Sequence, residues 1–189
     1  MPNTFAALLL LVAGIVAAQA ATANAPAPTS SGMSPALHPR AYCELARDLG
    51  YPSRGYKAHT GGCSSEMTTV TPTPGRNGLE NNLAFYVLGT GENATRISRV
   101  SLILNVNNVR EKARAQAELE RVAKSVAVRL VGTVPSDFSA VIKRAGSRRW
   151  PQGSWDIEIK SEVWPTGLGQ DTGVVPFPVE PRPVTVPIG

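Results

Sequence analysis

The sequence predicts an α+β domain in which a mainly antiparallel sheet of about four strands packs one face on a long helix, with a short helix first and one disulfide. Three observations predict this fold. The elements follow the order helix, three strands, two helices and strand; residues 109–131 form a long amphipathic stretch; and Cys43 and Cys63 are the only cysteines. The three leading strands should form a meander, because consecutive antiparallel strands usually lie side by side.

The chain begins with a hydrophobic leader. The apolar run from Phe5 to Val16 is shorter than the roughly 20 residues that span a bilayer, and small residues follow it, so residues 1–20 are typical of a signal peptide. We expect cleavage after Ala20, with Ala25 as a second position and an uncleaved anchor as the alternative, because no Lys or Arg precedes the run. The leader predicts a periplasmic or secreted protein without a stable transmembrane segment after cleavage.

Composition divides the rest of the chain into three parts. Residues 21–38 are rich in Ala, Pro and Ser and predict a flexible linker. Residues 165–189 are rich in Pro and Gly and predict a C-terminal tail, in which a central strand is not expected because proline removes backbone donors. Residues 39–164 are enough to bury one core and form a single domain.

The first half of the domain predicts a helix and three strands. Residues 39–49 favour a short helix, because proline suits its first turn and Gly50 suits the residue after its last. Residues 64–71 have the Thr, Val and Met content of a strand. Residues 83–88 are apolar at both odd and even positions and predict a central strand that is covered on both faces. Residues 96–106 alternate between apolar and polar side chains and predict a strand with one buried face.

The second half contains the clearest helix. Residues 109–131 follow Asn108 as an N-terminal cap and precede Gly132 as a C-terminal stop. The apolar stripe of this helix comprises Leu119, Val122, Ala123, Val126 and Leu130. Residues 136–145 predict a second helix, and residues 155–163 alternate as a last strand.

The polar face of the long helix is expected to be solvated. Its cations are Arg110, Arg114, Arg121 and Lys124. Glu118 and Glu120 stand three and four residues before Arg121 and Lys124, a spacing that places opposite charges side by side on a helix.

The two cysteines predict a disulfide. In an oxidising compartment each thiol has one possible partner, so Cys43 in the first helix should bond to Cys63 in the loop before the first strand. A metal site is the weaker alternative, because these thiols and the histidines His38 and His59 lack the close spacing of a ligand set. We predict no metal and no cofactor, and we expect both histidines to be solvated loop residues.

The sequence holds no G-x-S-x-G, S-x-x-K, C-x-x-C or H-E-x-x-H motif and no phosphate-binding loop, so we predict no catalytic residue. One acidic face is the exception. Asp156, Glu158 and Glu162 alternate on the last strand and could act as a carboxylate pair in a small envelope hydrolase, or form the contact face of an enzyme inhibitor. A charged edge strand is the simpler interpretation, because charges there discourage pairing with other chains.

Charge favours a binding protein instead. The chain carries a net charge of +5, and one segment joins four cations to an indole, a combination that can hold an anionic group. This basic segment comprises Lys143, Arg144, Arg148, Arg149 and Trp150. The alternative is a solvated helix end whose cations complement the helix carboxyl terminus.

These features together predict an exported, non-enzymatic binding or interaction module of the cell envelope. Its partner would be an anionic envelope polymer or an envelope protein, bound through the basic segment or through an exposed sheet edge. Nucleic acid is not expected, because no recognition helix or aromatic stacking platform is visible. A chaperone-like scaffold for secreted partners fits the same features.

Overall fold

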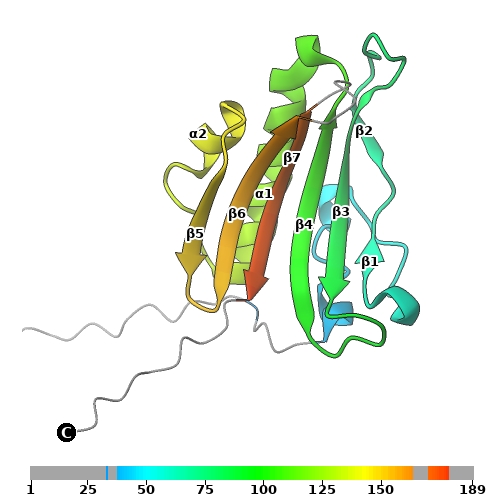
Figure 1. The fold of residues 1–189 in the computed structure, drawn as a ribbon, viewed down its shortest axis with the longest axis vertical. Helices are drawn as coiled ribbons and strands as arrows, with labels where there is room; N and C mark the ends of the chain where they lie inside the picture. The colour runs from blue at the N-terminus through cyan, green and yellow to red at the C-terminus, as the bar shows by residue number, and fades with distance from the viewer. Residues whose placement is uncertain (1–32, 34–37, 164–169, 179–189) are drawn as a thin grey trace, which may run out of the picture.

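The computed structural model describes Met33, residues 38–163 and, as backbone only, residues 170–178. A seven-stranded antiparallel sheet forms one layer, and the helix α1 (Lys112–Val131) lies across one of its faces (Figure 1). This arrangement confirms the predicted α+β class. The predicted leader lies outside the described residues, as does the predicted linker apart from Met33 and His38. No described helix is both long enough and apolar enough to cross a membrane.

The sheet follows the order β1-β3-β4-β7-β6-β5, with β2 also pairing with β3. Its strands are β1 (Cys63–Ser64), β2 (Thr68–Thr71), β3 (Asn81–Gly89), β4 (Ile97–Val106), β5 (Arg148–Gln152), β6 (Trp155–Val163) and β7 (Gln170–Pro178). The strands predicted at residues 83–88, 96–106 and 155–163 are confirmed as β3, β4 and β6. The sheet has more strands than the sequence predicts, because β5 and β7 join it and the first predicted strand is divided.

The division of the first predicted strand has a local cause. Between β1 and β2, the Ser65 hydroxyl accepts a hydrogen bond from the backbone N–H of Phe85 at 2.9 Å, in the place of a backbone carbonyl. The Ser65 backbone N–H in turn donates to the Phe85 carbonyl at 2.8 Å. The chain therefore stays beside β3 through Ser65 but leaves the regular ladder, and β1 and β2 are separate short strands on the same side of β3.

The prediction of a tail over residues 165–189 is wrong for residues 170–178. They form β7, which lies in the middle of the sheet between β4 and β6. The prolines are tolerated because β4 pairs with β7 only from Gln170 to Val174, whereas Pro176 and Pro178 lie beyond that ladder and face β6 alone. The other residues of the predicted tail, 165–169 and 179–189, lie outside the described residues.

The helical elements match the prediction in place, apart from η3, which the sequence does not predict, and they match partly in type. They are the 3-10 turns η1 (Pro39–Tyr42), η2 (Arg47–Leu49), η3 (Ala58–Thr60) and η4 (Val109–Glu111), and the α-helices α1 and α2 (Phe138–Lys143). The predicted first helix is a chain of i to i+3 hydrogen bonds through η1 and η2 rather than an α-helix, and Gly50 ends it with a φ of 99°. The Asn108 side chain caps the start of the long helix, and Gly132 ends it with a φ of 80°.

The core lies between α1 and the sheet. The whole predicted stripe of α1 is buried, and it faces the apolar side of the sheet. The sheet contributes Leu83, Phe85, Val87, Val100, Leu102, Leu104, Ile157 and Ile159. At one end of this core, the Trp155 indole donates a hydrogen bond to the Met33 carbonyl at 2.9 Å, which ties the described part of the predicted linker to the domain.

Two buried asparagines fix the start of α1 against the sheet. The Asn81 side chain accepts from the Asn108 backbone N–H at 2.7 Å and donates to the Asn108 carbonyl at 3.1 Å. The Asn108 amide donates to the carbonyl of Thr73 at 3.1 Å, in the turn that follows β2. These bonds hold the start of β3, the turn that follows β2 and the first turn of the helix in a defined relation, because buried polar groups that are fully paired have one low-energy arrangement.

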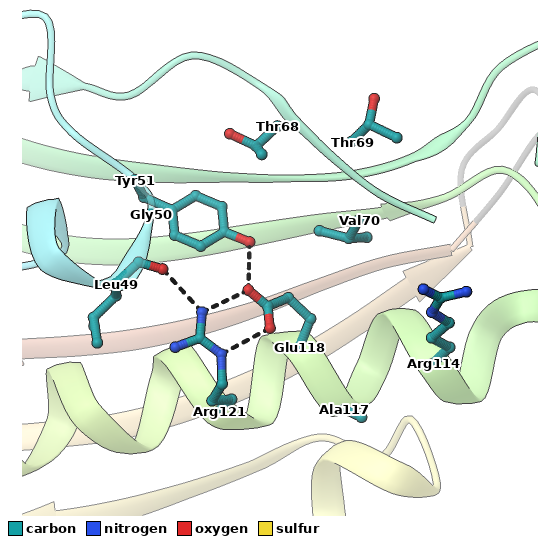
Figure 2. A pocket seen from close by; sticks show the side chains of 10 residues that line it. All are labelled: Leu49, Gly50, Tyr51, Thr68, Thr69, Val70, Arg114, Ala117, Glu118 and Arg121. Atoms are coloured by element: carbon teal, nitrogen blue, oxygen red, sulfur yellow. Dashed lines mark hydrogen bonds and ion pairs between the residues drawn. The ribbon is translucent and has the colours of Figure 1, made fainter. Parts of the chain in front are cut away.

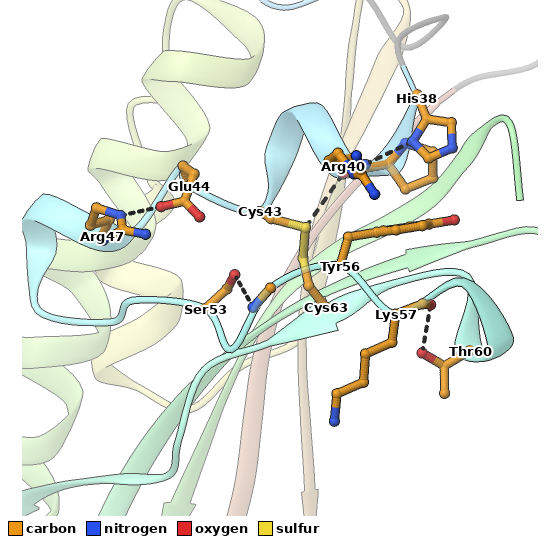
Figure 3. Close-up of a disulfide and its surroundings, with 12 residues drawn as sticks. His38, Arg40, Cys43, Glu44, Arg47, Ser53, Tyr56, Lys57, Thr60 and Cys63 are labelled. Carbon is orange, nitrogen blue, oxygen red and sulfur yellow. Dashed lines mark hydrogen bonds and ion pairs between the residues drawn. A yellow bond between two sulfur atoms is a disulfide. The ribbon is translucent and has the colours of Figure 1, made fainter. Parts of the chain in front are cut away.

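The predicted disulfide between Cys43 and Cys63 is present, with the two Cα atoms 6.0 Å apart (Figure 3). It joins the residue after η1 to the first residue of β1, and both cysteines are buried. The bond therefore fastens the N-terminal 3-10 turns to the edge of the sheet.

Candidate functional site

The basic segment is divided between a helix end and a sheet edge. Lys143 is the last residue of α2, whereas Arg148, Arg149 and Trp150 belong to β5, the edge strand that pairs only with β6. The sequence does not predict this strand, because cations and Pro151 are unusual in a strand interior. At an edge they are tolerated, since one side of the strand needs no hydrogen-bond partner.

The indole of the basic segment is part of the core rather than an exposed platform. Trp150 is 8% exposed, and its ring lies 6.0 Å from the ring of Phe138. Its indole N–H donates to Asp137 at 3.1 Å, and Arg148 binds the same carboxylate at 2.5 Å. The Arg148 guanidinium also lies 5.5 Å from the Trp150 ring centre. Asp137 therefore already occupies the position that an external anion would take between this cation and this ring.

Two of the three remaining cations of the basic segment are also near carboxylates. Arg149 forms an ion pair with Asp156 on the neighbouring strand. Lys143 lies 3.5 Å from Glu120 of α1. Arg144 is exposed at the end of α2. Internal neutralisation reduces the local positive charge, and anion binding at this segment stays a prediction.

Two of the three carboxylates on the acidic face of β6 are likewise paired. Asp156 is 3% exposed and bound to Arg149, and Glu162 pairs with Lys160. Glu158 lies opposite Arg149 in the ladder. None of the three acidic residues lines either of the two clefts described below. The interpretation of these residues as a charged edge strand is wrong, because β6 pairs with both β5 and β7. Ion pairs with Arg149 and Lys160 account for Asp156 and Glu162 instead.

A cleft that the sequence does not predict lies between β2, the end of η2 and α1 (Figure 2). We call it the β2 cleft; its volume is about 510 Å³. The side chains important for its chemistry are Tyr51, Thr69, Val70, Arg114, Glu118 and Arg121. They come from three separate parts of the sequence, so only the folded chain brings them together.

One wall of the β2 cleft is a closed hydrogen-bond network. The Tyr51 hydroxyl donates to Glu118 at 2.9 Å, and Arg121 binds the same carboxylate through two nitrogens at 2.7 and 2.8 Å (Figure 2). Arg121 also donates to the Leu49 carbonyl at 2.9 Å. The pair of Glu118 and Arg121 confirms the predicted charge pairing on the helix, and Lys124 binds Glu120 in the same way at 2.8 Å.

This network has a fixed charge state near neutral pH. Hydrogen bonds from Arg121 lower the pKa of Glu118 below its ordinary value of 4.5, with a further contribution from Tyr51 and against the opposing effect of burial. Burial first, and then the bond to Glu118, raise the pKa of Tyr51 well above its ordinary value. An anionic carboxylate and a neutral phenol suit a rigid wall better than a proton donor and acceptor pair working near pH 7.

The lowered pKa of Glu118 predicts a specific pH dependence of stability. A carboxylate with a lowered pKa in the folded state contributes stability that is present above its unfolded pKa and lost as the pH falls through the folded pKa. We therefore expect Glu118→Gln to be less stable than wild type at neutral pH, with the difference shrinking between about pH 5 and pH 2. Urea unfolding across this range measures it, with Glu92→Gln, an exposed loop residue, as control. A difference that does not change with pH would contradict the network.

The opposite side of the β2 cleft is open. Arg114 lies one turn before Glu118 on α1, and its side chain extends toward β2 (Figure 2). No ion pair joins Arg114 to any described carboxylate. It also stands in the first turn of the helix, where the aligned peptide dipoles add positive potential. The open side of the cleft therefore attracts a negatively charged group.

The edge strand β2 borders this open side. Among the described strands, β2 pairs with β3 alone. The other edge of Thr68–Thr71 therefore faces away from the sheet. The other two edge strands are protected: the Arg54 N–H covers β1 by donating to the Ser64 carbonyl at 2.9 Å, and β5 contains Pro151. The four residues of β2 include neither proline nor charge. Its one protective device is a register shift between Thr69 and Thr71, which shortens the regular edge.

No family model, curated protein or solved structure matches this chain. Its function is therefore argued from the geometry of its own residues. Across residues 38–163, no group of three or more His, Cys, Asp and Glu side chains is arranged to hold a metal ion. The open edge of β2 together with the β2 cleft is one arrangement of the described residues whose binding groups have no partner within the fold.

Proposed function

We propose that this chain is an exported, non-enzymatic binding module that takes an extended, acidic segment of a partner protein along β2. The observation that carries the proposal is the edge of β2 that has no neighbouring strand and no charged residue. This edge borders a cleft that is lined by Arg114, a cation without an ion-pair partner among the described residues. Export is supported by the hydrophobic leader and is compatible with the disulfide.

The backbone of β2 supplies the affinity in this proposal. Along a strand, every second residue directs its N–H and C=O groups away from its ladder partner. Apart from the pairing with β3, no backbone hydrogen bond from a described residue reaches Thr68–Thr71. An incoming extended segment pairs with these groups and continues the sheet, which is a common mode of peptide recognition. The register shift next to Val70 limits the regular contact to a few residues.

The cleft supplies the selectivity. Side chains on one face of the added strand would enter the β2 cleft, where Val70 offers an apolar contact and Arg114 a positive charge. An acidic residue of the partner is favoured over a basic one, because the carboxylate of Glu118 is already satisfied by Arg121 and Tyr51 whereas Arg114 is not. The net charge of +5 adds long-range attraction for an acidic partner.

Charge reversal at Arg114 tests this function. A library of random seven-residue peptides displayed on phage is selected against the mature chain, and enriched peptides are expected to combine β-branched residues with Asp or Glu. We expect Arg114→Glu to weaken the binding of such a peptide by about tenfold or more, measured by fluorescence anisotropy.

Two matched variants serve as controls. Arg99→Glu makes the same charge change at an exposed position of β4 and should change affinity much less. The double variant Arg148→Ala and Arg149→Ala removes cations of the basic segment and should also leave affinity nearly unchanged. Loss of binding in this double variant with no loss in Arg114→Glu would place recognition on the basic segment and overturn the proposal.

A further inference from the structure

A second cavity lies at the other end of the edge of the sheet, next to the disulfide. We call it the Tyr56 pocket; its volume is about 590 Å³. It is lined by His38, Arg40, Ala41, Tyr56, Ala58 and Asn93. None of these residues lines the β2 cleft. The Tyr56 pocket is thus a separate candidate site, independent of the proposed function.

The walls of this pocket are held in place by the fold. The disulfide ties the segment after η1 to β1 (Figure 3). The Asn93 backbone N–H donates to the Ala58 carbonyl at 2.8 Å. Gly61 lets two loops approach, because a Cβ there would collide with the Gly91 carbonyl. Asn93 itself has a φ of 51°, a left-handed conformation that asparagine tolerates better than most residues. The cavity is therefore formed before any ligand binds.

Aromatic and cationic groups meet inside the pocket. The Tyr56 ring is fixed by its hydroxyl, which donates to the Ala94 carbonyl at 3.3 Å, and by the edge of the His38 ring at 4.9 Å. The Arg40 guanidinium lies 5.4 Å from the centre of the same ring. No described carboxylate forms an ion pair with Arg40, in contrast to Lys143, Arg148 and Arg149 of the basic segment.

The donors of the pocket have defined directions. His38 Nδ1 accepts a hydrogen bond from the Arg40 backbone N–H at 3.1 Å, so the neutral ring carries its proton on Nε2 and offers a donor there. A guanidinium over an aromatic ring keeps the N–H groups of its planar edge available for a carboxylate. The Asn93 amide adds a donor and an acceptor, and Ala41 and Ala58 add apolar walls.

We infer that the Tyr56 pocket binds an acidic saccharide, with the sugar carboxylate on Arg40 and ring hydroxyls on His38 and Asn93. The C–H faces of a sugar ring pack on aromatic and methyl groups, and its hydroxyls need both donors and acceptors. A simple inorganic anion would use Arg40 but would leave the apolar walls unused. A neutral sugar would leave the guanidinium unpaired.

Calorimetric titration with trigalacturonate, a uronic acid trisaccharide, tests this inference. We expect measurable binding, about tenfold weaker binding of the neutral trisaccharide maltotriose, and a loss of about tenfold on Arg40→Gln. Arg76→Gln makes the same charge change in the exposed loop between β2 and β3 and should bind like wild type. Asn93→Gly keeps the left-handed backbone and should weaken binding several-fold. Unfolding curves establish that each variant is folded.

Three results would overturn the inference. Equal affinity for trigalacturonate and maltotriose would remove the role of the carboxylate. Competition by inorganic phosphate as effective as trigalacturonate itself would indicate a site for simple anions. No heat of binding at millimolar trigalacturonate, with a folded protein and an intact disulfide, would exclude a saccharide of this class. The Arg114→Glu variant separates the two sites, because it should bind trigalacturonate normally.

Discussion

We expect the chain truncated after Val163 not to fold, which is the largest effect predicted here. β4 and β6 are both paired with β7 and not with each other, so removing β7 leaves two disconnected pieces of sheet. The apolar faces of both pieces pack on the same core, and each loses a hydrogen-bonded edge that is buried in the complete domain. Far-UV circular dichroism and urea unfolding of the truncated chain should show loss of structure and of a cooperative transition.

A second truncation gives the matched control. The chain ended after Pro178 keeps every described strand and should unfold cooperatively, with a free energy of unfolding close to that of the full chain. If the chain ended after Val163 folded equally well, β7 would contribute no essential pairing.

The second large effect is expected from the disulfide. Replacing Cys43 and Cys63 together by serine should lower the free energy of unfolding by about 3 kcal/mol, the chain-entropy value for a loop of this length. The cysteines are 20 positions apart, and both are buried in the core cluster, so serine hydroxyls at these positions also add a desolvation cost. Urea unfolding under oxidising conditions measures the difference.

Reduction of the wild type checks the same prediction without substitution. A dithiol reductant should destabilise the wild type by a similar amount and leave the double serine variant unchanged. The reduced protein should also lose affinity for trigalacturonate, because the disulfide supports one wall of the Tyr56 pocket. A wild type whose urea midpoint does not respond to the reductant would show that the bond is absent or does not constrain the unfolded chain.

The parts of the fold that the sequence predicts are those with a complete local pattern. The periodic stripe of α1, its Asn108 cap and its Gly132 stop lie within one segment, and the alternation of β4 and β6 is equally local. The disulfide was predictable because two cysteines allow one intramolecular pair. In each case the prediction depends only on residues close together in the sequence or on the number of cysteines.

The parts that the sequence does not predict depend on neighbours in space. Prolines at 176 and 178 argue against a strand until the register shows that the pairing of β7 with β4 stops at Val174, before them. The β2 cleft joins Tyr51, β2 and Arg114, which no spacing rule connects. Arg114 shares the polar helix face with Arg121; the spacing predicts the carboxylate partner of Arg121, but only the fold shows that Arg114 faces the open edge.

The most direct test of binding along β2 is amide hydrogen exchange of the mature chain with and without a selected acidic peptide. Addition of a strand to β2 predicts slower exchange at Thr68–Thr71, because outward N–H groups gain acceptors. It predicts little change at Arg148–Gln152, the edge strand that carries the basic segment. Protection of Arg148–Gln152 with none at β2 would contradict the account and place the partner on the opposite edge of the sheet.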